Sequence, residues 1–139
     1  MKGIIFTERL VNKMQRRNGD LPLILKQVAA RDLSVVFMTK DVSAFCNQSI
    51  FDGRIKFKNV CIFKAYSGKK ILTKELVEVL KKMRVPAEGM VFVSSEDKDY
   101  NIAKQKGMTF VLYSVSTRHQ KMPYITINKL TLLLEALEN

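Results

Sequence analysis

Short runs of apolar, β-forming residues alternate along the chain with segments of helical periodicity, and this alternation restricts the fold more than any other feature. The runs lie at residues 4–6, 35–38, 60–63, 90–93, 110–113 and 124–127. Apolar runs of this length are typical of strands that are buried on both faces of a parallel sheet. The sequence therefore predicts a three-layer α/β domain with a central, mainly parallel sheet of five to six strands, in which residues 124–127 form an edge strand.

The segments between these runs carry the signals of helices. Helices are expected at residues 20–31, 42–48, 72–83, 97–106 and 130–137. Asp20 offers an N-cap and Pro22 suits the first helical turn, whereas Gly107 suits the left-handed position that follows a helix. The stretch before the third strand is expected to hold a basic loop that contains Gly53.

The chain has 139 residues, which is the length of a single domain with a substantial core. No linker, repeat or low-complexity segment divides it, so residues 1–139 are expected to form one domain. No apolar run approaches about 18 residues, which argues against a transmembrane segment, and no export signal precedes the first strand. The two cysteines, Cys46 and Cys61, lack the spacing of metal ligands, so we expect reduced thiols and a cytoplasmic protein.

Positive charge is concentrated in the first half of the chain. The formal net charge is +11, and residues 1–70 hold 14 basic and 5 acidic side chains. Such an imbalance favours polyanionic partners in general, such as nucleic acid, phosphorylated ligands or an acidic protein surface. The charge alone does not select one of these partners.

Residues 85–108 combine a proline-led turn, an apolar strand, an acidic loop and a helix that ends in Gly107-Met108. With the segments at residues 4–9, 35–40, 68–70 and 124–130, in this order, the chain resembles the haloacid dehalogenase (HAD) superfamily over nearly its whole length. The resemblance implies a Rossmann-like, HAD-like domain without a large cap. The commonest members of this superfamily are magnesium-dependent phosphatases that form an aspartyl-phosphate, and several residues that this chemistry requires are replaced here.

The first replacement concerns the groups that react. In catalytic members of the superfamily the first strand ends in Asp-x-Asp, where one carboxylate attacks phosphorus and the other acts as general acid and base. Thr7 and Arg9 stand at these two positions. A threonine hydroxyl needs a neighbouring base before it can attack, and a guanidinium does not release its proton at physiological pH. Continuing the strand period past Thr7 directs Glu8 away from the site, so Glu8 is not expected to replace the missing carboxylate.

Groups that would hold a phosphate are retained. The resemblance places Thr39, at the end of the second strand, on a phosphoryl oxygen, and it places Lys69 or Lys70 beside the phosphate charge. Of these two lysines we favour Lys70. Ser94 and Ser95, at the end of the fourth strand, complete the predicted phosphate-binding set.

The loop after the fourth strand supplies magnesium ligands in catalytic members of the superfamily. In the register of the resemblance, Ser95 replaces the first acidic ligand and Asp99 retains the second. Because magnesium prefers octahedral oxygen ligation anchored by carboxylates, we expect no metal and no other cofactor. The neighbouring Glu96 and Asp97 offer replacement carboxylates, although acidic residues are also common at the start of a helix.

These replacements predict a catalytically inactive HAD-like domain that acts by binding or assembly. In one version the old site holds a phosphorylated ligand, with Arg9 as an added cation. In the other version a basic surface binds a nucleic acid or an acidic protein, and its candidate residues are Lys13, Arg16, Arg17, Arg54, Lys56, Lys58, Lys69 and Lys70. Phe51 and Phe57 lie among these residues and are candidates either for stacking on bases or for the core. The resemblance also raises the expectation of a homo-oligomer.

The alternative is a magnesium-dependent phosphatase in which the catalytic roles have moved to Glu8, Glu96 or Asp99. Loss of a general acid or base alone typically reduces the rate by about 10²- to 10⁴-fold, and loss of the nucleophile removes the covalent route. The inactive version is therefore preferred. A receiver-type phosphoacceptor domain fits less well, because the chain lacks an acidic cluster after its first strand.

Overall fold

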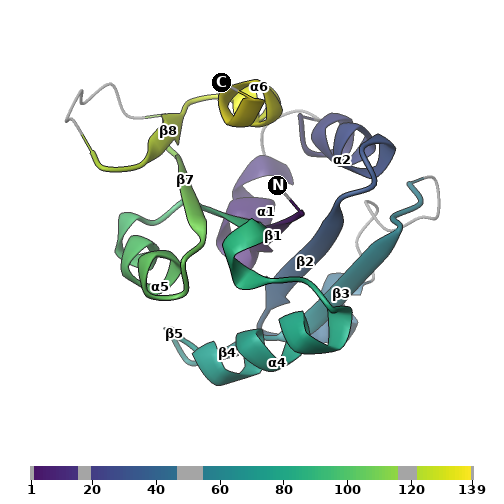
Figure 1. Ribbon diagram of the computed structural model, residues 1–139, viewed down its shortest axis with the longest axis vertical. Helices are drawn as coiled ribbons and strands as arrows, with labels where there is room; N and C mark the ends of the chain where they lie inside the picture. The colour runs from purple at the N-terminus through teal and green to yellow at the C-terminus, as the bar shows by residue number, and fades with distance from the viewer. Residues whose placement is uncertain (1, 16–19, 47–54, 116–121, 139) are drawn as a thin grey trace.

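The computed structural model describes residues 2–15, 20–46, 55–115 and 122–138, which form three layers around a six-stranded sheet (Figure 1). The strands are β1 Gly3–Thr7, β2 Ser34–Thr39, β3 Asn59–Lys64, β6 Met90–Ser94, β7 Thr109–Tyr113 and β8 Ile125–Ile127. Their order is β3-β2-β1-β6-β7-β8, and every neighbouring pair is parallel. The predicted α/β class, the parallel sheet and the edge position of the last strand are confirmed.

Helices cover both faces of this sheet. One face packs against α1 Glu8–Gln15, α2 Asp20–Ala30 and α6 Leu133–Glu138, and the other packs against α4 Thr73–Met83 and α5 Tyr100–Gln105. In Figure 1, α2 and α6 lie at the top of the view and α4 and α5 lie lower. The shorter elements are α3 Val42–Cys46, the 3-10 turns η2 Ala87–Gly89, η3 Asp97–Asp99 and η4 Leu130–Leu132, and a hairpin of β4 Tyr66–Ser67 and β5 Lys70–Ile71.

The helices predicted from periodicity are present, with differences at their ends. The helix expected from Asp97 begins with the 3-10 turn η3 and becomes α-helical only at Tyr100. Asp20 is the first residue of α2 rather than a cap that precedes it. Gly107 has a φ angle of 73°, which is the left-handed conformation that its position predicted.

Two elements have no counterpart among the predicted ones. The helix α1 begins directly after β1, and the β4–β5 hairpin follows β3. The predicted basic loop around Gly53 lies outside the described residues. Within the described residues, no helix has both the length and the apolar character needed to cross a membrane.

Apolar cores form on both faces of the sheet, because successive residues of each strand point to opposite faces. Phe6 of β1 belongs to the core beneath α1 and α2, whereas Ile5 belongs to the core beneath α4 and α5. Phe37 of β2 is fully buried, and its ring centroid lies 5.6 Å from that of Phe6 and 5.5 Å from that of Phe45. Phe57 packs edge-on against the same ring at 6.2 Å. Aromatic side chains thus fill the centre of the first core.

The amino end of β1 is packed too closely for any side chain. A Cβ atom built on Gly3 would lie 2.5 Å from the carbonyl oxygen of Ser34 in β2 and 2.8 Å from Sδ of Met90 in β6. The carbonyl belongs to the backbone of a neighbouring strand and cannot give way as a flexible side chain can. Close approach of three strands therefore requires glycine at this position.

The central position of β1 determines where a site can form. β2 lies on one side of β1 and β6 on the other, so the order of the strands reverses between β1 and β6. In open parallel sheets, ligands bind beyond the carboxyl ends of the strands at such a reversal. A functional site is therefore expected at the ends of β1, β2 and β6.

Candidate functional site

Polar residues from distant parts of the sequence meet at this edge of the sheet. Thr7 ends β1, Thr39 ends β2 and Ser94 ends β6, and all three side chains are buried. A pocket here, which we call the strand-end pocket, is lined by Thr7, Glu8, Arg9, Lys40, Tyr66, Lys69, Ile71, Ser94, Glu96, Lys98 and Asp99. Its volume is about 20 Å³, which is room for about one water molecule.

Thr7 acts as a helix cap in this structure. Its Oγ1 atom accepts a hydrogen bond of 3.4 Å from the backbone N–H of Leu10, in the first turn of α1. Threonine is among the residues preferred at this position, because its hydroxyl satisfies a backbone donor that the helix leaves unpaired. Within the described ranges, no carboxylate or imidazole is hydrogen-bonded to Thr7 Oγ1. Among the described residues, the hydroxyl therefore has no hydrogen-bonded base that would activate it for attack.

Glu8 lies in the site, and the prediction that it points away is wrong. The strand ends at Thr7 and α1 begins at Glu8, so the alternation of a strand no longer applies at this residue. The Thr39 hydroxyl donates to Glu8 Oε1 at 3.1 Å, and the backbone N–H of Lys40 donates to Oε2 at 3.0 Å. Both oxygens of the carboxylate are thus held by the end of β2.

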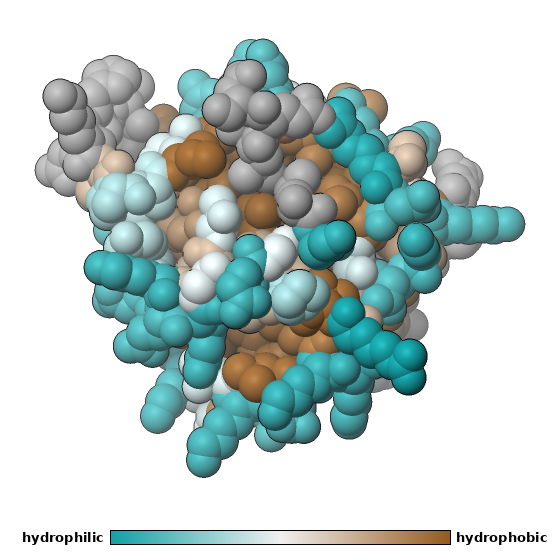
Figure 2. Space-filling model, viewed as in Figure 1, coloured by the Kyte–Doolittle hydropathy of each residue, from teal (hydrophilic) through white to brown (hydrophobic). Residues whose placement is uncertain are grey.

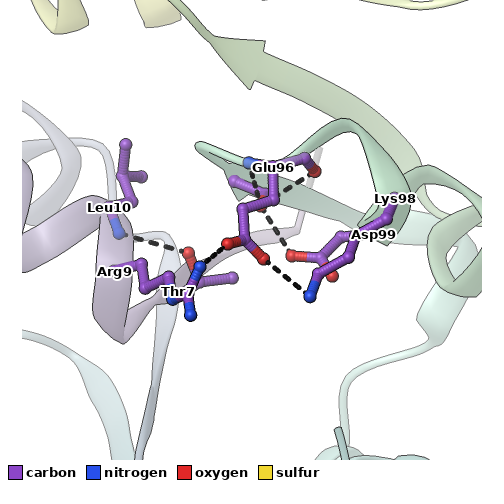
Figure 3. A network of polar contacts seen from close by, with 7 residues as sticks. Thr7, Arg9, Leu10, Glu96, Lys98 and Asp99 are labelled. Atoms are coloured by element: carbon purple, nitrogen blue, oxygen red, sulfur yellow. Dashed lines mark hydrogen bonds and ion pairs between the residues drawn. The ribbon is translucent and has the colours of Figure 1, made fainter. Parts of the chain in front are cut away.

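Arg9 pairs with a carboxylate from the loop that follows β6. Its Nη1 atom contacts Oε1 of Glu96, and Lys98 Nζ lies 3.3 Å from Oε2 of the same carboxylate. Figure 3 shows Arg9 from α1 and Lys98 from η3 approaching Glu96 from two sides. The Arg9 side chain is 53% exposed, so solvent screens this pair and its contribution to stability is small. Both residues of the pair line the strand-end pocket.

Ser94 and Asp99 form a buried pair below Glu96. The Ser94 hydroxyl donates to Asp99 Oδ2 at 2.7 Å, and the backbone N–H of Glu96 donates to Ser94 Oγ at 3.0 Å (Figure 3). Burial raises the pKa of Asp99, and the hydrogen bond from Ser94 together with the charges of Lys98 and Arg9 only partly offsets that rise. Asp99 is therefore a carboxylate whose charged form is costly in this position.

Tyr66, from β4, brings a phenol to the same pocket. Burial raises its pKa strongly, and the nearby carboxylates of Asp99 and Glu8 raise it further. A hydrogen bond from the backbone of Glu8 and the charge of Arg9 act in the opposite direction without cancelling the rise. The phenol consequently stays protonated near neutral pH, where it is a neutral hydrogen-bond donor beside two acidic residues.

The structure separates the predicted phosphate-binding residues into two groups. Ser94 and Lys69 line the strand-end pocket, and Thr39 reaches it through Glu8. Lys70, which we favoured over Lys69, is an exposed residue of β5 and does not line this pocket. Ser95 lines a different hollow, beside Leu112. The residues of the first group are all hydrogen-bonded to the chain's own carboxylates, except Lys69.

The described lysines of the predicted basic surface do not form one patch. Lys13 is exposed on α1, whereas Lys56 and Lys58 precede β3. Lys69 and Lys70 follow β3 and lie beyond its opposite end, about 20 Å away for a strand of this length. Arg16, Arg17, Arg54 and Phe51 lie outside the described residues. Phe57 is half-buried against Phe37, which confirms the core alternative for this phenylalanine.

The donors at this site do not match those that magnesium requires. In the register of the resemblance, Thr7 and Ser95 stand at positions where acidic ligands are expected, and Asp99 is hydrogen-bonded to Ser94. Within the ranges that the structure describes, no three residues among His, Cys, Asp and Glu lie close enough to hold a metal ion. Octahedral ligation anchored by carboxylates is therefore not available from these residues, and we derive no step through a metal.

Lys40, Tyr66 and Lys98 line the strand-end pocket and were not predicted there, and Glu8, which was expected only in the phosphatase alternative, lines it as well. A helix-start signal was present for Glu8, because a threonine followed by an acidic residue is typical of a first helical turn. For Tyr66 the only local signal was a turn at Gly68, where the φ angle is 60°. Lys98 reaches Glu96 through the conformation of a loop, which sequence spacing does not specify.

Replacing Asp99 with asparagine is expected to stabilise the protein at neutral pH. The pKa of Asp99 is raised above its ordinary value of 3.8, so the folded state binds a proton more tightly than the unfolded state. Stability is then lost as pH rises from 3.8 through the raised pKa. Asparagine keeps an acceptor for Ser94 and carries no charge. In thermal unfolding, Asp99→Asn should have the higher Tm at pH 7, and this advantage should shrink as the pH falls toward 4.

A variant that is less stable than the parent at every pH would contradict this expectation, because it would mean that the charged form contributes favourably. Asp97→Asn is a suitable control, since Asp97 is an exposed neighbour on the same 3-10 turn. Its Tm should differ little from that of the parent across the same range of pH.

The chain was compared with known proteins at three levels. No protein-family model matches it and no curated protein matches it in sequence. Among solved structures, the core domain of a candidate phosphoglycolate phosphatase from Streptococcus pneumoniae TIGR4 superimposes with a TM-score of 0.64 at 12% identity, over 99% of this chain and 96% of that one.

Two larger structures also match. A 2-haloacid dehalogenase from Pseudomonas syringae pv. Tomato DC3000 gives a TM-score of 0.60 at 16% identity, over 87% of this chain and 53% of that one. A HAD-superfamily hydrolase of subfamily IA from Geobacter sulfurreducens PCA gives a TM-score of 0.57 at 17% identity, over 81% of this chain and 52% of that one. The chain thus spans about half the length of these two proteins. The strand order, the parallel sheet and these superpositions together show that the chain has the Rossmann-like fold of the haloacid dehalogenase superfamily.

Proposed function

We propose that this chain is a catalytically inactive HAD-like domain that acts by binding. The observation that carries the proposal is the state of Thr7, which stands where a nucleophilic carboxylate would stand and caps α1 instead. A hydroxyl that accepts a hydrogen bond from a helix, and to which no base is hydrogen-bonded in the described part of the chain, is not an activated nucleophile. Arg9, at the position of the acid and base, is held in an ion pair with Glu96.

The hydrogen bonds of Glu8 support the same conclusion. The Thr39 hydroxyl is the donor expected to hold a phosphoryl oxygen, and it is bound to the Glu8 carboxylate together with the N–H of Lys40. A carboxylate resembles a phosphate in presenting two oxygens to such donors. Glu8 therefore occupies the place of an anion, and a phosphorylated substrate would meet a negative charge there.

A phosphatase assay tests this proposal. The chain should release no aryl alcohol from a generic aryl phosphate above the rate without protein, with or without magnesium. Thr7→Ala should give the same result, because Thr7 has only a structural role in the proposal. Turnover that is lost in Thr7→Ala would overturn the proposal directly.

The same assay addresses a phosphatase with rearranged residues. Glu8, Glu96 and Asp99 are the carboxylates of the strand-end pocket. Magnesium-dependent turnover that disappears in Glu8→Gln or Asp99→Asn would assign catalysis to these carboxylates and would reject the proposal of an inactive domain.

A cytoplasmic location and a homo-oligomer remain predictions from the sequence.

A further inference from the structure

Three lysines surround a second, wider hollow beside the strand-end pocket. Lys40 follows β2, Lys64 ends β3 and Lys69 lies in the turn of the β4–β5 hairpin. The hollow has a volume of about 830 Å³, and Leu72 and Glu75 complete its wall. We call it the lysine hollow. It lies near the hairpin and the start of α4, in the lower part of Figure 1.

Two of these lysines are carried by neighbouring strand ends. Thr39 of β2 is paired with Lys64 of β3, and the ladder continues because the N–H of Ala65 donates to the Thr39 carbonyl at 2.9 Å. Lys40 is the next residue after Thr39, and its own N–H is held by Glu8. Neighbouring strands lie about 4.8 Å apart. The two ammonium groups are therefore carried by adjacent strand ends with fixed backbones.

The described residues do not neutralise the positive charge of the lysine hollow. In the part of the chain that the structure describes, none of these three lysines forms an ion pair with a carboxylate. Glu75 is the one acidic residue among those that line the hollow. Cations that line the same hollow repel one another, and solvent screens this repulsion only in part. A bound polyanion would remove that repulsion.

We propose that the lysine hollow binds the phosphate backbone of a nucleic acid. The inference rests on the proposed role of the chain as a binding module and names the surface and the partner. Lysine is a point charge that pairs with phosphates without demanding one geometry. A domain with a pI of about 9.8 also attracts nucleic acid over a longer range.

A chain of phosphates suits this surface better than one phosphate group. A single phosphate is held tightly where several donors converge, and the convergent donors of this edge, Thr39 and the N–H of Lys40, are already bound to Glu8. The lysine hollow is wide, and its three cations come from three different segments. Figure 2 shows hydrophilic side chains projecting along the lower part of this face, where the hairpin and α4 lie in Figure 1.

The test compares two triple variants of equal charge. The first variant removes the three ammonium groups of the lysine hollow and is Lys40→Ala/Lys64→Ala/Lys69→Ala. The second removes three exposed lysines that do not line the hollow and is Lys26→Ala/Lys82→Ala/Lys129→Ala. The probe is a fluorescent single-stranded oligonucleotide of twelve thymidines, followed by anisotropy at several salt concentrations. All the substituted residues are exposed, so both variants should retain the circular dichroism spectrum of the parent.

The parent should bind the oligonucleotide with an affinity that falls as salt rises. Removing the three ammonium groups should weaken binding about tenfold or more at low salt. It should also make the slope of log K against log salt shallower by about 2, because three contacts to single-stranded nucleic acid are lost. The control variant should change the affinity by less than about threefold. Equal losses in the two variants would overturn the proposal, because binding would then depend on total charge alone.

Two further outcomes would also reject it. No change in anisotropy at low salt would exclude nucleic acid as the partner. Stronger competition by poly-glutamate than by unlabelled oligonucleotide would assign the hollow to an acidic protein instead. None of these results depends on the phosphatase assay, so failure of the inactive-domain proposal and failure of the nucleic-acid surface can be told apart.

Discussion

Glu8→Ala should bind inorganic phosphate about a hundredfold more tightly than the parent chain. The substitution removes the carboxylate that now accepts from the Thr39 hydroxyl and from the N–H of Lys40. These two donors are left to bind another anion. Removing a like charge about 4 Å from the phosphate is worth up to about 4 kcal/mol at an effective dielectric constant of 20, and solvent at this edge reduces that figure. Isothermal titration with orthophosphate measures the change.

Two variants serve as controls for this result. Glu8→Gln removes the charge but leaves a side chain in the same space, so it should gain less affinity than Glu8→Ala. Glu135→Ala removes one exposed carboxylate far along the chain, in α6, and should behave as the parent does. If Glu8→Ala remains folded and gives no more heat than the parent at millimolar phosphate, Glu8 is not an internal replacement for an anion.

Phe37→Ala should remove a large part of the stability of the fold. The ring is fully buried in the centre of the sheet and contacts Phe6, Phe45 and Phe57. Truncating a buried phenylalanine costs about 3–5 kcal/mol, because apolar surface is lost and the cavity does not close completely. Natural domains have unfolding free energies of about 5–15 kcal/mol, so the expected loss is a substantial fraction of the total. Urea denaturation followed by circular dichroism measures it.

Leu23→Ala provides the matched comparison. Leu23 is 48% exposed on α2, so its truncation should change the unfolding free energy by less than about 1 kcal/mol. A Phe37→Ala variant that loses no more than the Leu23→Ala variant would show that the aromatic cluster does not stabilise this face of the sheet.

The sheet could be predicted from the sequence because each strand is a short apolar run between polar segments. A strand that is buried on both faces must be apolar throughout, and this requirement is visible locally in residues 35–38 and 90–93. The β4–β5 hairpin could not be predicted in the same way. Each of its strands has two residues, and no pattern of burial can be recognised in so short a segment.

The candidate site was predictable in its outline and not in its contacts. The order of the segments located Thr7, Thr39, Ser94 and Asp99 near one edge of the sheet, where the structure places them. The predicted direction of the Glu8 side chain was wrong because the strand period was continued one residue too far, whereas Glu8 already belongs to α1. Such a change depends on whether β1 ends at residue 7 or at residue 9, and tertiary packing determines that end.

The ion pairs of the site depend on loop conformation in the same way. The sequence offered Glu96 as a replacement ligand for a metal, yet this side chain contacts Arg9 and Lys98. The three side chains are brought together by the path of the chain between β6 and η3, and an acidic loop in a sequence does not reveal which cation it will face. Lys69 and Lys70 illustrate the same difficulty, because one position in a tight hairpin decides which of them reaches the pocket.

The close packing at Gly3 is a requirement of the fold and lies far from the strand-end pocket. Three strands meet there at the amino ends of the sheet, where a single added methyl group has no room. Thr7 lies at the opposite end of β1, where it caps α1, and Arg9 follows it in the first turn of that helix. Side chains at the carboxyl ends can therefore change without disturbing the packing at the amino ends, so a polypeptide that is only 12% identical to the Streptococcus pneumoniae core domain can still form the same sheet.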